Sequence, residues 1–338
     1  MGLRDVKRGS SGLSLIVGVD KPEGMSSHDV VNRCRRIFDE RRIGHTGTLD
    51  PLATGVLPVC IGPATRLDQF MTAHDKRYRV RIGFGFETTT DDKMGDMTTS
   101  ATVPAYLFDE GFARERVEML VRQHVQVPPQ YSAIKIDGRK AYEIARSGGS
   151  VELEPRVVEV YEAHLVDMRE DEDGLSLQWT VDVSVSKGTY IRSLVRDLGR
   201  EVMCPAHVTA LERRSVGKIG LEHCVSLDVL ENLKLDAALD PVRILGYRFA
   251  FGDKVEKFVN SGTKLYPDQV ALYEPPPMQS NGYACPCTSS ICESEMPPED
   301  GEHASIVVNN RLKALYTYSS KTKAWQPACV FSTSVFRG

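Results

Sequence analysis

The sequence has no long hydrophobic run, because no stretch approaches the roughly 20 consecutive apolar residues that a transmembrane helix requires. Its N-terminal segment, MGLRDVKRGSSGLS, is basic but lacks the apolar core of a signal peptide, and the following LSLIVGV is too short to supply one. These absences exclude a membrane-spanning protein and predict a cytoplasmic one.

Cysteines are also sparse. Eight of them in 338 residues do not indicate a disulfide framework, so reduced thiols are expected. Three, Cys285, Cys287 and Cys292, fall in one Pro- and Ser-rich stretch as C-P-C-x4-C. Zinc loops usually carry two paired knuckles, and the second pair is missing here. A flexible insertion is therefore favoured, and no metal site is predicted.

Net charge is small and negative, at −4, which would argue against a nucleic-acid partner if it were evenly spread. It is uneven, because residues 1–80 hold 13 Lys/Arg against 9 Asp/Glu and residues 187–218 hold 7 against 3. A local basic face can bind phosphate whatever the total charge. Runs of charge are more often ordinary solvated surface, so the pattern alone is weak evidence for an RNA partner.

Helical and strand patterns are interleaved without a strict βαβ rhythm. Ser26 and Asp29 form a capping-box pattern ahead of a helix. Apolar residues alternate with polar ones over 78–86 and 175–185, which indicates half-buried strands. The pattern predicts an α/β (or α+β) catalytic domain over residues 1–240, with a mixed, largely antiparallel sheet.

The composition changes near residue 240. Residues 241–338 are rich in Val, Tyr, Ser and Lys and contain short strand-like runs such as VALYE, ASIVVNN and LKALYTYS. They predict a small C-terminal β domain that is interrupted by the Cys/Pro/Ser-rich insertion.

A predicted helix over residues 191–202 carries three arginines on one face. Arg192, Arg196 and Arg200 stand at positions i, i+4 and i+8. For Arg196 and Arg200 the favoured interpretation is a solvated helix face. Arg192 follows a strand exit closely, in GTYIRS, and is expected at the edge of the sheet.

The stretch GHTGTLDPLATG sets a single carboxylate, Asp50, among turn-forming residues at the edge of a predicted strand. On the residues alone Asp50 has three interpretations: a turn residue, a metal ligand or a nucleophile. The turn residue is favoured at this point. A metal site would need more carboxylates or histidines nearby, and only His45 is close.

The order of motifs resembles the tRNA pseudouridine synthases of the TruB family. The resemblance rests on DKPEGMSSHDVV, GHTGTLDPLATGVLPVCIGPATR, KRYRVRIGFGFETTTDD, SKGTYIRSLVRDLG and AHVTALERR, with support from PPQYSAIKIDGRKAYEIAR. These blocks run from residue 20 to about residue 215 in the family's order, and GHTGTLDPLATG is highly specific.

The resemblance implies that Asp50 attacks a uridine, whose N-glycosidic bond is broken and whose uracil is rejoined through C5. No organic cofactor is implied, since no redox step or group donor takes part. The implied substrate is the uridine at position 55 in the TΨC loop of tRNA. The resemblance also implies that the C-terminal domain is PUA-like and binds RNA. The sequence does not determine the oligomeric state, and we expect a monomer without an obligate protein partner.

Two further catalytic roles are implied by the resemblance. Arg192 matches the partner of the catalytic aspartate, where its charge would oppose the effect of burial on the carboxylate. Tyr78 matches the tyrosine that stacks on the extruded base and accepts the C5 proton. A core tyrosine stays open as an alternative, because Tyr78 lies on the apolar phase of its strand.

Four substrate-binding roles are carried over in the same way. His45 is matched to the residue that fills the space left by the extruded base, although a His that caps its own turn is the plainer alternative. Tyr190 is matched to a second aromatic residue of the pocket, and Leu211 to an apolar wall. Lys21 is expected near phosphate, or as a structural lysine.

The sequence departs from the TruB family pattern at one position, and two alternative functions stay open. Many members have an Asp where this chain has Thr89, although Asp92 stands at the later acidic position. One rival is a tRNA-binding or tRNA-folding module with little catalysis. The other is a pseudouridine synthase that acts on another RNA.

Overall fold

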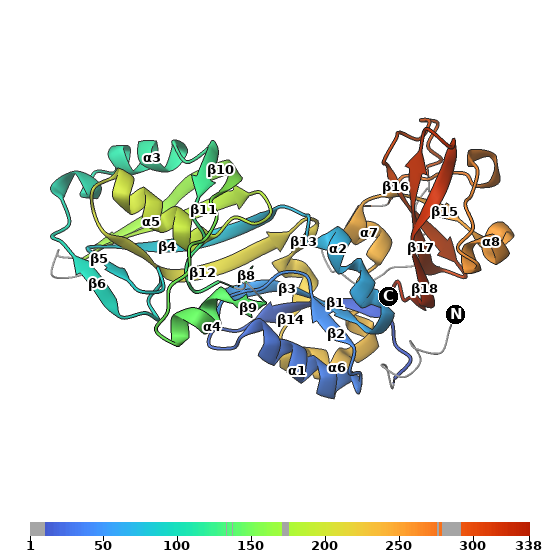
Figure 1. Cartoon of the computed structure of the whole chain (residues 1–338), viewed down its shortest axis with the longest axis horizontal. Helices are drawn as coiled ribbons and strands as arrows, with labels where there is room; N and C mark the ends of the chain where they lie inside the picture. The colour runs from blue at the N-terminus through green and yellow to red at the C-terminus, as the bar shows by residue number, and fades with distance from the viewer. Residues whose placement is uncertain (1–10, 133, 137, 171–175, 276, 279–291) are drawn as a thin grey trace. The chain divides into compact units, whose positions relative to one another are not determined.

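The computed structural model describes residues 11–132, 134–136, 138–170, 176–275, 277–278 and 292–338. The chain forms two compact units, Met1–Ala73 with Ser215–Gly338, and His74–Arg214 (Figure 1). The second unit is therefore inserted in the sequence of the first. The predicted mixed α/β architecture is confirmed, whereas the predicted boundary at residue 240 stays a prediction.

The first unit opens with a small sheet and two helices. β1 pairs antiparallel with β3 and parallel with β14, and β2 pairs antiparallel with β3. Helices α1 and α6 pack side by side against this sheet (Figure 1). The elements are β1 (Leu15–Lys21), α1 (Ser27–Phe38), β2 (Ile43–His45), β3 (Thr54–Ile61), η1 (Gly62–Leu67), α2 (Asp68–Met71), β13 (Ile219–Gly220), η3 (Leu221–His223), β14 (Cys224–Val225), α6 (Leu227–Leu233), η4 (Lys234–Ala237) and α7 (Pro241–Leu245).

The start of α1 follows the predicted capping box. The Ser26 hydroxyl accepts a hydrogen bond from the Asp29 amide at 3.2 Å, and the Asp29 carboxylate accepts one from the Ser26 amide at 2.9 Å. The helix then buries an apolar face that includes Val30, Cys34 and Ile37.

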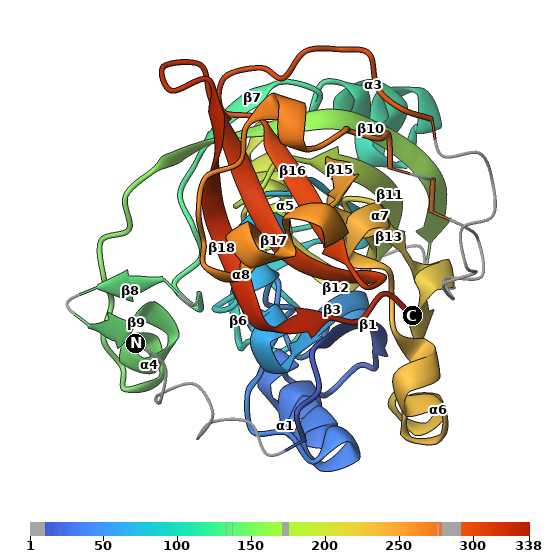
Figure 2. The ribbon, with the colours of Figure 1, turned by 90° about the vertical axis from the view of Figure 1, so that its right-hand side faces the viewer.

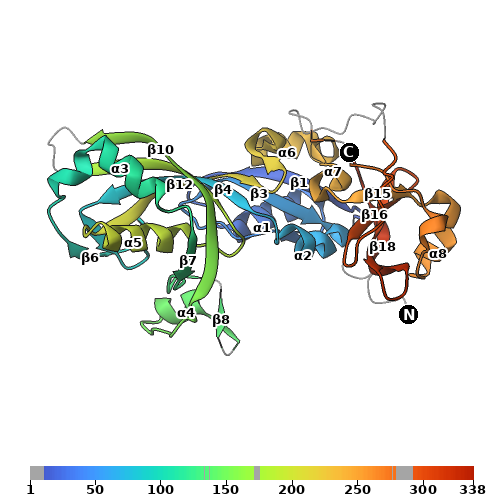
Figure 3. The same ribbon diagram turned by 90° about the horizontal axis from the view of Figure 1, so that it is seen from above.

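The second unit is built on strands in the order β12-β4-β11-β10-β7, in which β4, β11, β10 and β7 pair antiparallel. Two register shifts interrupt the pairing of β10 with β11, and the long β10 curves along its length (Figure 3), as bulged strands do. The elements are β4 (Lys76–Phe84), β5 (Phe86–Thr88), β6 (Met97–Ser100), η2 (Ala105–Phe108), α3 (Glu110–Glu118), β7 (Gln123–Gln126), β8 (Lys135–Ile136), β9 (Arg139–Lys140), α4 (Ala141–Arg146), β10 (Arg156–Glu170), β11 (Leu177–Val185), α5 (Ile191–Glu201) and β12 (Ala206–Val216).

Two predicted strands are confirmed with altered bounds. The strand expected over 78–86 ends at Phe84, because Gly85 has a φ of 106° and breaks it. The strand expected over 175–185 is β11, with alternate residues buried, and Leu175 lies outside the described residues. On the more exposed face of β4, Arg79 binds both carboxylate oxygens of Asp182 at 2.7 Å.

A four-stranded sheet at the C-terminal end of the first unit confirms the predicted small β domain. Its strands lie in the order β15-β16-β17-β18 (Figure 2). Two of the three strand-like runs, ASIVVNN and LKALYTYS, form strands, while VALYE forms only isolated bridges at Tyr273. Cys285 and Cys287 lie outside the described residues. The elements are β15 (Arg248–Phe251), η5 (Asp253–Val255), α8 (Glu256–Asn260), η6 (Pro267–Gln269), β16 (His303–Val308), β17 (Arg311–Ser319) and β18 (Ala324–Val335).

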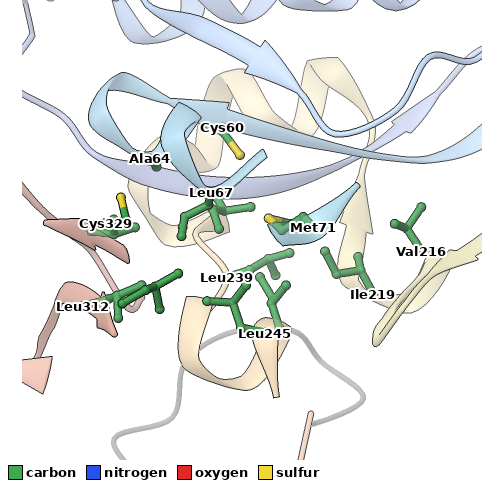
Figure 4. Packing of buried hydrophobic residues seen from close by; sticks show 14 of the residues in the cluster. Cys60, Ala64, Leu67, Met71, Val216, Ile219, Leu239, Leu245, Leu312 and Cys329 are labelled. Atoms are coloured by element: carbon green, nitrogen blue, oxygen red, sulfur yellow. The ribbon is translucent and has the colours of Figure 1, made fainter. Parts of the chain in front are cut away.

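One apolar core joins this C-terminal sheet to the N-terminal strands of the same unit. Ile16, Val56 and Cys60 share one face of β1 and β3, and this face belongs to a cluster with Leu312 and Phe331 of the C-terminal sheet. Leu67 and Met71 of η1 and α2 lie in the same cluster (Figure 4). At about 25 cal/mol per Å² of apolar area, such a core stabilises both parts strongly.

Candidate active site

Asp50 lies at the tip of a β-hairpin. Strands β2 and β3 pair from Ile43 opposite Ile61 to His45 opposite Val59, and the loop between them spans residues 46–53. The Ala53 amide donates to the Asp50 carbonyl at 3.0 Å, which closes a β-turn with Pro51 at its second position, where proline is favoured. The turn is real, and it leaves the Asp50 side chain half-buried between buried Leu49 and exposed Pro51.

The backbone on both sides of Asp50 is held by the segment that joins β1 to α1. Ser27, at the first turn of α1, accepts from the Leu49 amide at 2.8 Å and donates to the Leu49 carbonyl at 3.0 Å. The Pro51 carbonyl accepts from the Gly24 amide at 2.8 Å and from Lys21 Nζ at 3.4 Å. The positions of residues 49 and 51 therefore fix where the carboxylate of Asp50 can lie.

Lys21 is fully buried, with 0% of its surface exposed. Its ammonium also donates to the carbonyls of Pro22 at 2.8 Å and Met25 at 2.6 Å. Of the two expected roles for Lys21, this geometry favours the structural one, because the ammonium donates to backbone carbonyls in a place that solvent does not reach.

His45 ends β2 and is half-buried. Its Nδ1 accepts a hydrogen bond from the Gly47 amide at 3.3 Å, so the ring does cap its own turn. Gly47 has a φ of 142°, a backbone conformation that favours glycine. A contact of His45 with RNA stays a prediction.

Tyr78 and Leu211 are buried residues of the second unit, on β4 and β12, with 8% and 7% of their surfaces exposed. Lys76 shares the buried face of β4 with Tyr78. Burial lowers the pKa of Lys76 to about 8, with a smaller contribution from the charge of Arg213, and the Lys76 amine donates to the His74 carbonyl.

Tyr190 stands at the N-terminal cap of α5. Its amide and carbonyl are both held by the side-chain amide of Gln126, at 2.8 and 3.1 Å. The Arg156 guanidinium lies 5.6 Å from the centre of the Tyr190 ring, a cation–π contact. The start of α5 is therefore fixed to β7 and β10.

Arg192 is buried at the first turn of α5, with only 4% of its side chain exposed. Its guanidinium donates from Nη1 to the Thr90 carbonyl and from Nη2 to the Tyr131 carbonyl, each at 2.8 Å. Its Nε lies 3.8 Å from a carboxylate oxygen of Asp92, the acidic residue singled out in the sequence. The expectation of an edge position rather than a solvated helix face is consistent with this burial.

The prediction that Arg196 is solvated is wrong. The same prediction for Arg200 is confirmed. Only 13% of the Arg196 side chain is exposed, because it pairs with Asp91 at 3.1 Å, while 65% of the Arg200 side chain is exposed. Thr89, the departure from the family pattern, is exposed, and its hydroxyl accepts from the Asp96 amide at 3.2 Å.

The predicted site residues fall into two groups. Lys21, His45 and Asp50 lie in the first unit, and Tyr78, Tyr190, Arg192 and Leu211 lie in the second. Sequence reasoning missed Ser27 and Gly24, although the serine that follows the helix-capping Ser26 could have suggested an inward hydroxyl. Among the described residues, no group of three His, Cys, Asp or Glu could hold a metal ion, and every helix is too short or too polar to span a bilayer.

Comparison with known proteins defines the chain as a pseudouridylate synthase. Residues 35–191 match the family model described as the TruB family pseudouridylate synthase N-terminal domain. The chain is 39% identical over 233 residues to tRNA pseudouridine synthase B of Bacillus cytotoxicus, covering 68% of this chain and 74% of that protein. It is 42% identical over 227 residues to the protein of the same name from Caldanaerobacter subterraneus, covering 67% and 76%. The chain belongs to the TruB family.

Solved structures agree at the level of the fold. A chain of an H/ACA ribonucleoprotein bound to a substrate RNA containing 2'-deoxyuridine matches with a TM-score of 0.63 and 20% identity, covering 98% of this chain and 91% of that one. The archaeal box H/ACA Nop10–Cbf5 complex gives a TM-score of 0.59, also with 20% identity, covering 97% and 89%.

Proposed function

We propose that this protein isomerises uridine to pseudouridine in tRNA, with the uridine at position 55 of the TΨC loop as its target and Asp50 as the nucleophile. The substrate class is supported by relatives named tRNA pseudouridine synthase B, at about 40% identity over two thirds of the chain. The T-loop target and the roles of individual residues are supported by the resemblance of the motifs.

The observation that carries the proposal is the way in which the turn of Asp50 is held. Its two neighbours, Leu49 and Pro51, are fixed by the buried Ser27 hydroxyl and by Gly24 with buried Lys21. A turn that served only to reverse the chain would not need such support on both sides. A nucleophile does need it, because its rate depends on placement against the reacting carbon.

In the proposed reaction the bond from the sugar to N1 of uracil breaks, the base turns, and a bond to C5 forms. The C5 proton is lost and N1 gains one, so the step is a balanced isomerisation without donor or oxidant. Asp50 attacks the uridine, and the bond that its carboxylate forms breaks again before the product leaves, so the free carboxylate is regenerated. Arg192 acts as its cationic partner, and Tyr78 stacks on the base and takes the C5 proton.

The remaining roles concern the extruded nucleotide. Base extrusion costs a few kcal/mol, and we assign His45 to fill the space that is left. Tyr190 and Leu211 form an aromatic and an apolar wall, and Lys21 holds the Asp50 turn.

The proposal is tested by incubating purified protein with a tRNA transcript and mapping pseudouridine at each uridine. Wild type should modify position 55, and Asp50→Asn should lose the activity while binding tRNA within about threefold of wild type, since phosphate contacts dominate affinity. Asp228→Asn is the matched control, because that carboxylate lies on α6 with 94% of its side chain exposed. Modification of a different uridine, or full activity of Asp50→Asn, would contradict the corresponding part of the proposal.

A second test addresses Arg192. Lysine keeps the charge but not the planar fork that reaches two carbonyls, so Arg192→Lys should react about 100-fold more slowly or worse. Turnover near the wild-type rate would remove Arg192 from the proposed machinery.

A further inference from the structure

Arg192 is one of two arginines of α5 that bridge the same pair of segments. It joins the Thr90 carbonyl to the Tyr131 carbonyl. Arg196, one turn later, joins the Asp91 carboxylate at 3.1 Å to the Val127 carbonyl at 3.0 Å. The two guanidinium groups, on successive turns of α5, thus both connect the loop of residues 88–95 to the segment of residues 127–131.

Arg196 binds Asp91, a residue with an unfavourable backbone conformation. Asp91 has a φ of 59°, which disfavours a residue that carries a side chain. Its amide donates to the Thr88 carbonyl at 3.2 Å, and its carbonyl accepts from the Val208 amide of β12 at 3.1 Å. Asp91 therefore connects the loop to β12 through its backbone and to α5 through its side chain.

The charge of Arg196 is what allows the Asp91 carboxylate to stay where it is. Only 15% of the Asp91 side chain is exposed, and burial raises its pKa, while the charges of Arg196 and then Arg192 act in the opposite direction. Without Arg196 the carboxylate would lose its nearest counter-charge and would either take up a proton or move toward solvent. The preceding carbonyl of the chain, that of Thr90, shares a peptide bond with the Asp91 nitrogen and is the acceptor for Arg192.

We propose that Asp91 and Arg196 are a positioning pair, which fixes the Thr90 carbonyl and thereby the direction of the Arg192 guanidinium during the reaction. The inference rests on the proposed role of Arg192. It assigns no contact with the uridine to either residue. Removal of the pair should slow the chemical step and leave the binding of tRNA nearly unchanged.

The test measures single-turnover rates at saturating enzyme for Asp91→Asn, Arg196→Gln and the double variant. Each single change should lower the rate by about 10- to 100-fold, because small misplacements of a catalytic group have effects of that size. The double variant should be no slower than the slower single variant, since both changes break one unit. Arg196→Lys, which keeps the ion pair, should recover part of the rate.

Arg200→Gln is the matched control on the next turn of the same helix, and it should react at the wild-type rate. Unfolding of each variant is followed by the fluorescence of buried Trp179, with Trp325 replaced by Phe in all of them, so that the rate is compared among folded proteins only. Wild-type rates in Arg196→Gln with a slow Arg192→Lys would overturn the positioning pair alone. Fast turnover in both would overturn the proposed role of Arg192 as well.

Discussion

The loop of Asp50 and the loop of residues 88–95 hold their charged residues in opposite ways. In the first, Asp50 itself stays half-buried, and neutral backbone groups on both sides are fixed by Ser27, Gly24 and Lys21. In the second, charged side chains make the connection directly, as Asp91 does with Arg196.

The difference matches what each loop has to present. The carboxylate proposed as the nucleophile must lie at a fixed place, and the contacts of Ser27, Gly24 and Lys21 fix the backbone of its two neighbours. A guanidinium has five N–H donors, so it can donate several hydrogen bonds to carbonyls and still keep its charge. The Asp50 loop is thus expected to respond mainly to the loss of packing and hydrogen bonds, and the 88–95 loop to the loss of charge.

Deleting residues 241–338 should cause the largest difference in stability between the two loops. The deletion removes Leu312, Phe331 and the rest of the C-terminal contribution to the core that also contains Ile16 of β1. We expect the hairpin of residues 43–61 to lose its protection from hydrogen exchange, while residues 74–214 keep theirs and Trp179 keeps its native fluorescence. A fragment with a fully protected hairpin would show that the N-terminal strands fold without the C-terminal sheet.

Lys21→Met should give the next largest effect. It removes an ammonium that serves the carbonyls of Pro22, Met25 and Pro51 in a fully buried position. We expect the first unit to lose about 3 kcal/mol or more of unfolding free energy, measured by urea unfolding with Trp325 fluorescence in a Trp179→Phe background. In a separate Trp325→Phe background, Trp179 fluorescence should report an unchanged second unit, and equal losses in both units would contradict the local role.

Ser27→Ala should have a smaller effect of the same kind. The amide and the carbonyl of Leu49 both lose their partner in a buried place, at a cost of about 1–3 kcal/mol. Ser26→Ala is the matched comparison, since it removes only an exposed helix cap worth about 1 kcal/mol. If the two variants lowered the rate of pseudouridine formation equally, the Ser27 contact would have no special importance for Asp50.

The smallest effect concerns acid sensitivity of the second unit. Burial lowers the pKa of His207, and a hydrogen bond to the Phe86 carbonyl and the charge of Asp92 oppose this less strongly. The neutral ring is therefore the form that stabilises the fold, so its stability is complete above about pH 6.5 and falls as the pH drops through the lowered value. His207→Asn can keep the bond to Phe86 and should flatten the fall in melting temperature between pH 7.5 and 5. His164→Asn, at an exposed position, should leave the curve unchanged.

Sequence reasoning reached the elements that periodicity and capping determine. The start of α1 at Ser26, the alternation in β4 and the C-terminal sheet all followed from local pattern. It failed where distant segments decide the outcome. Arg196 was predicted to be solvated because helical spacing cannot reveal that Asp91, 105 residues earlier, takes up a left-handed backbone conformation and meets it.

The inward role of Ser27 escaped for a similar reason. Ser26 and Ser27 look equivalent in the sequence. They differ only because Leu49, which lies far along the chain, packs where its backbone can bond to the Ser27 hydroxyl. The seven proposed site residues were chosen from the resemblance of whole motifs, and the residues that support the turn of Asp50 were found only with the fold.

The shared core of the first unit also has a consequence for synthesis on the ribosome. Residues 74–214 are contiguous and form one compact unit, but Ile16 and Val56 belong to a core cluster whose last member in the chain is Val335. At the usual rates of about 5–20 residues per second, the N-terminal strands wait roughly 15–50 s for these partners. During that time the apolar face of β1 and β3 lacks its native cover, so the N-terminal segment is the part of the nascent chain most in need of chaperones.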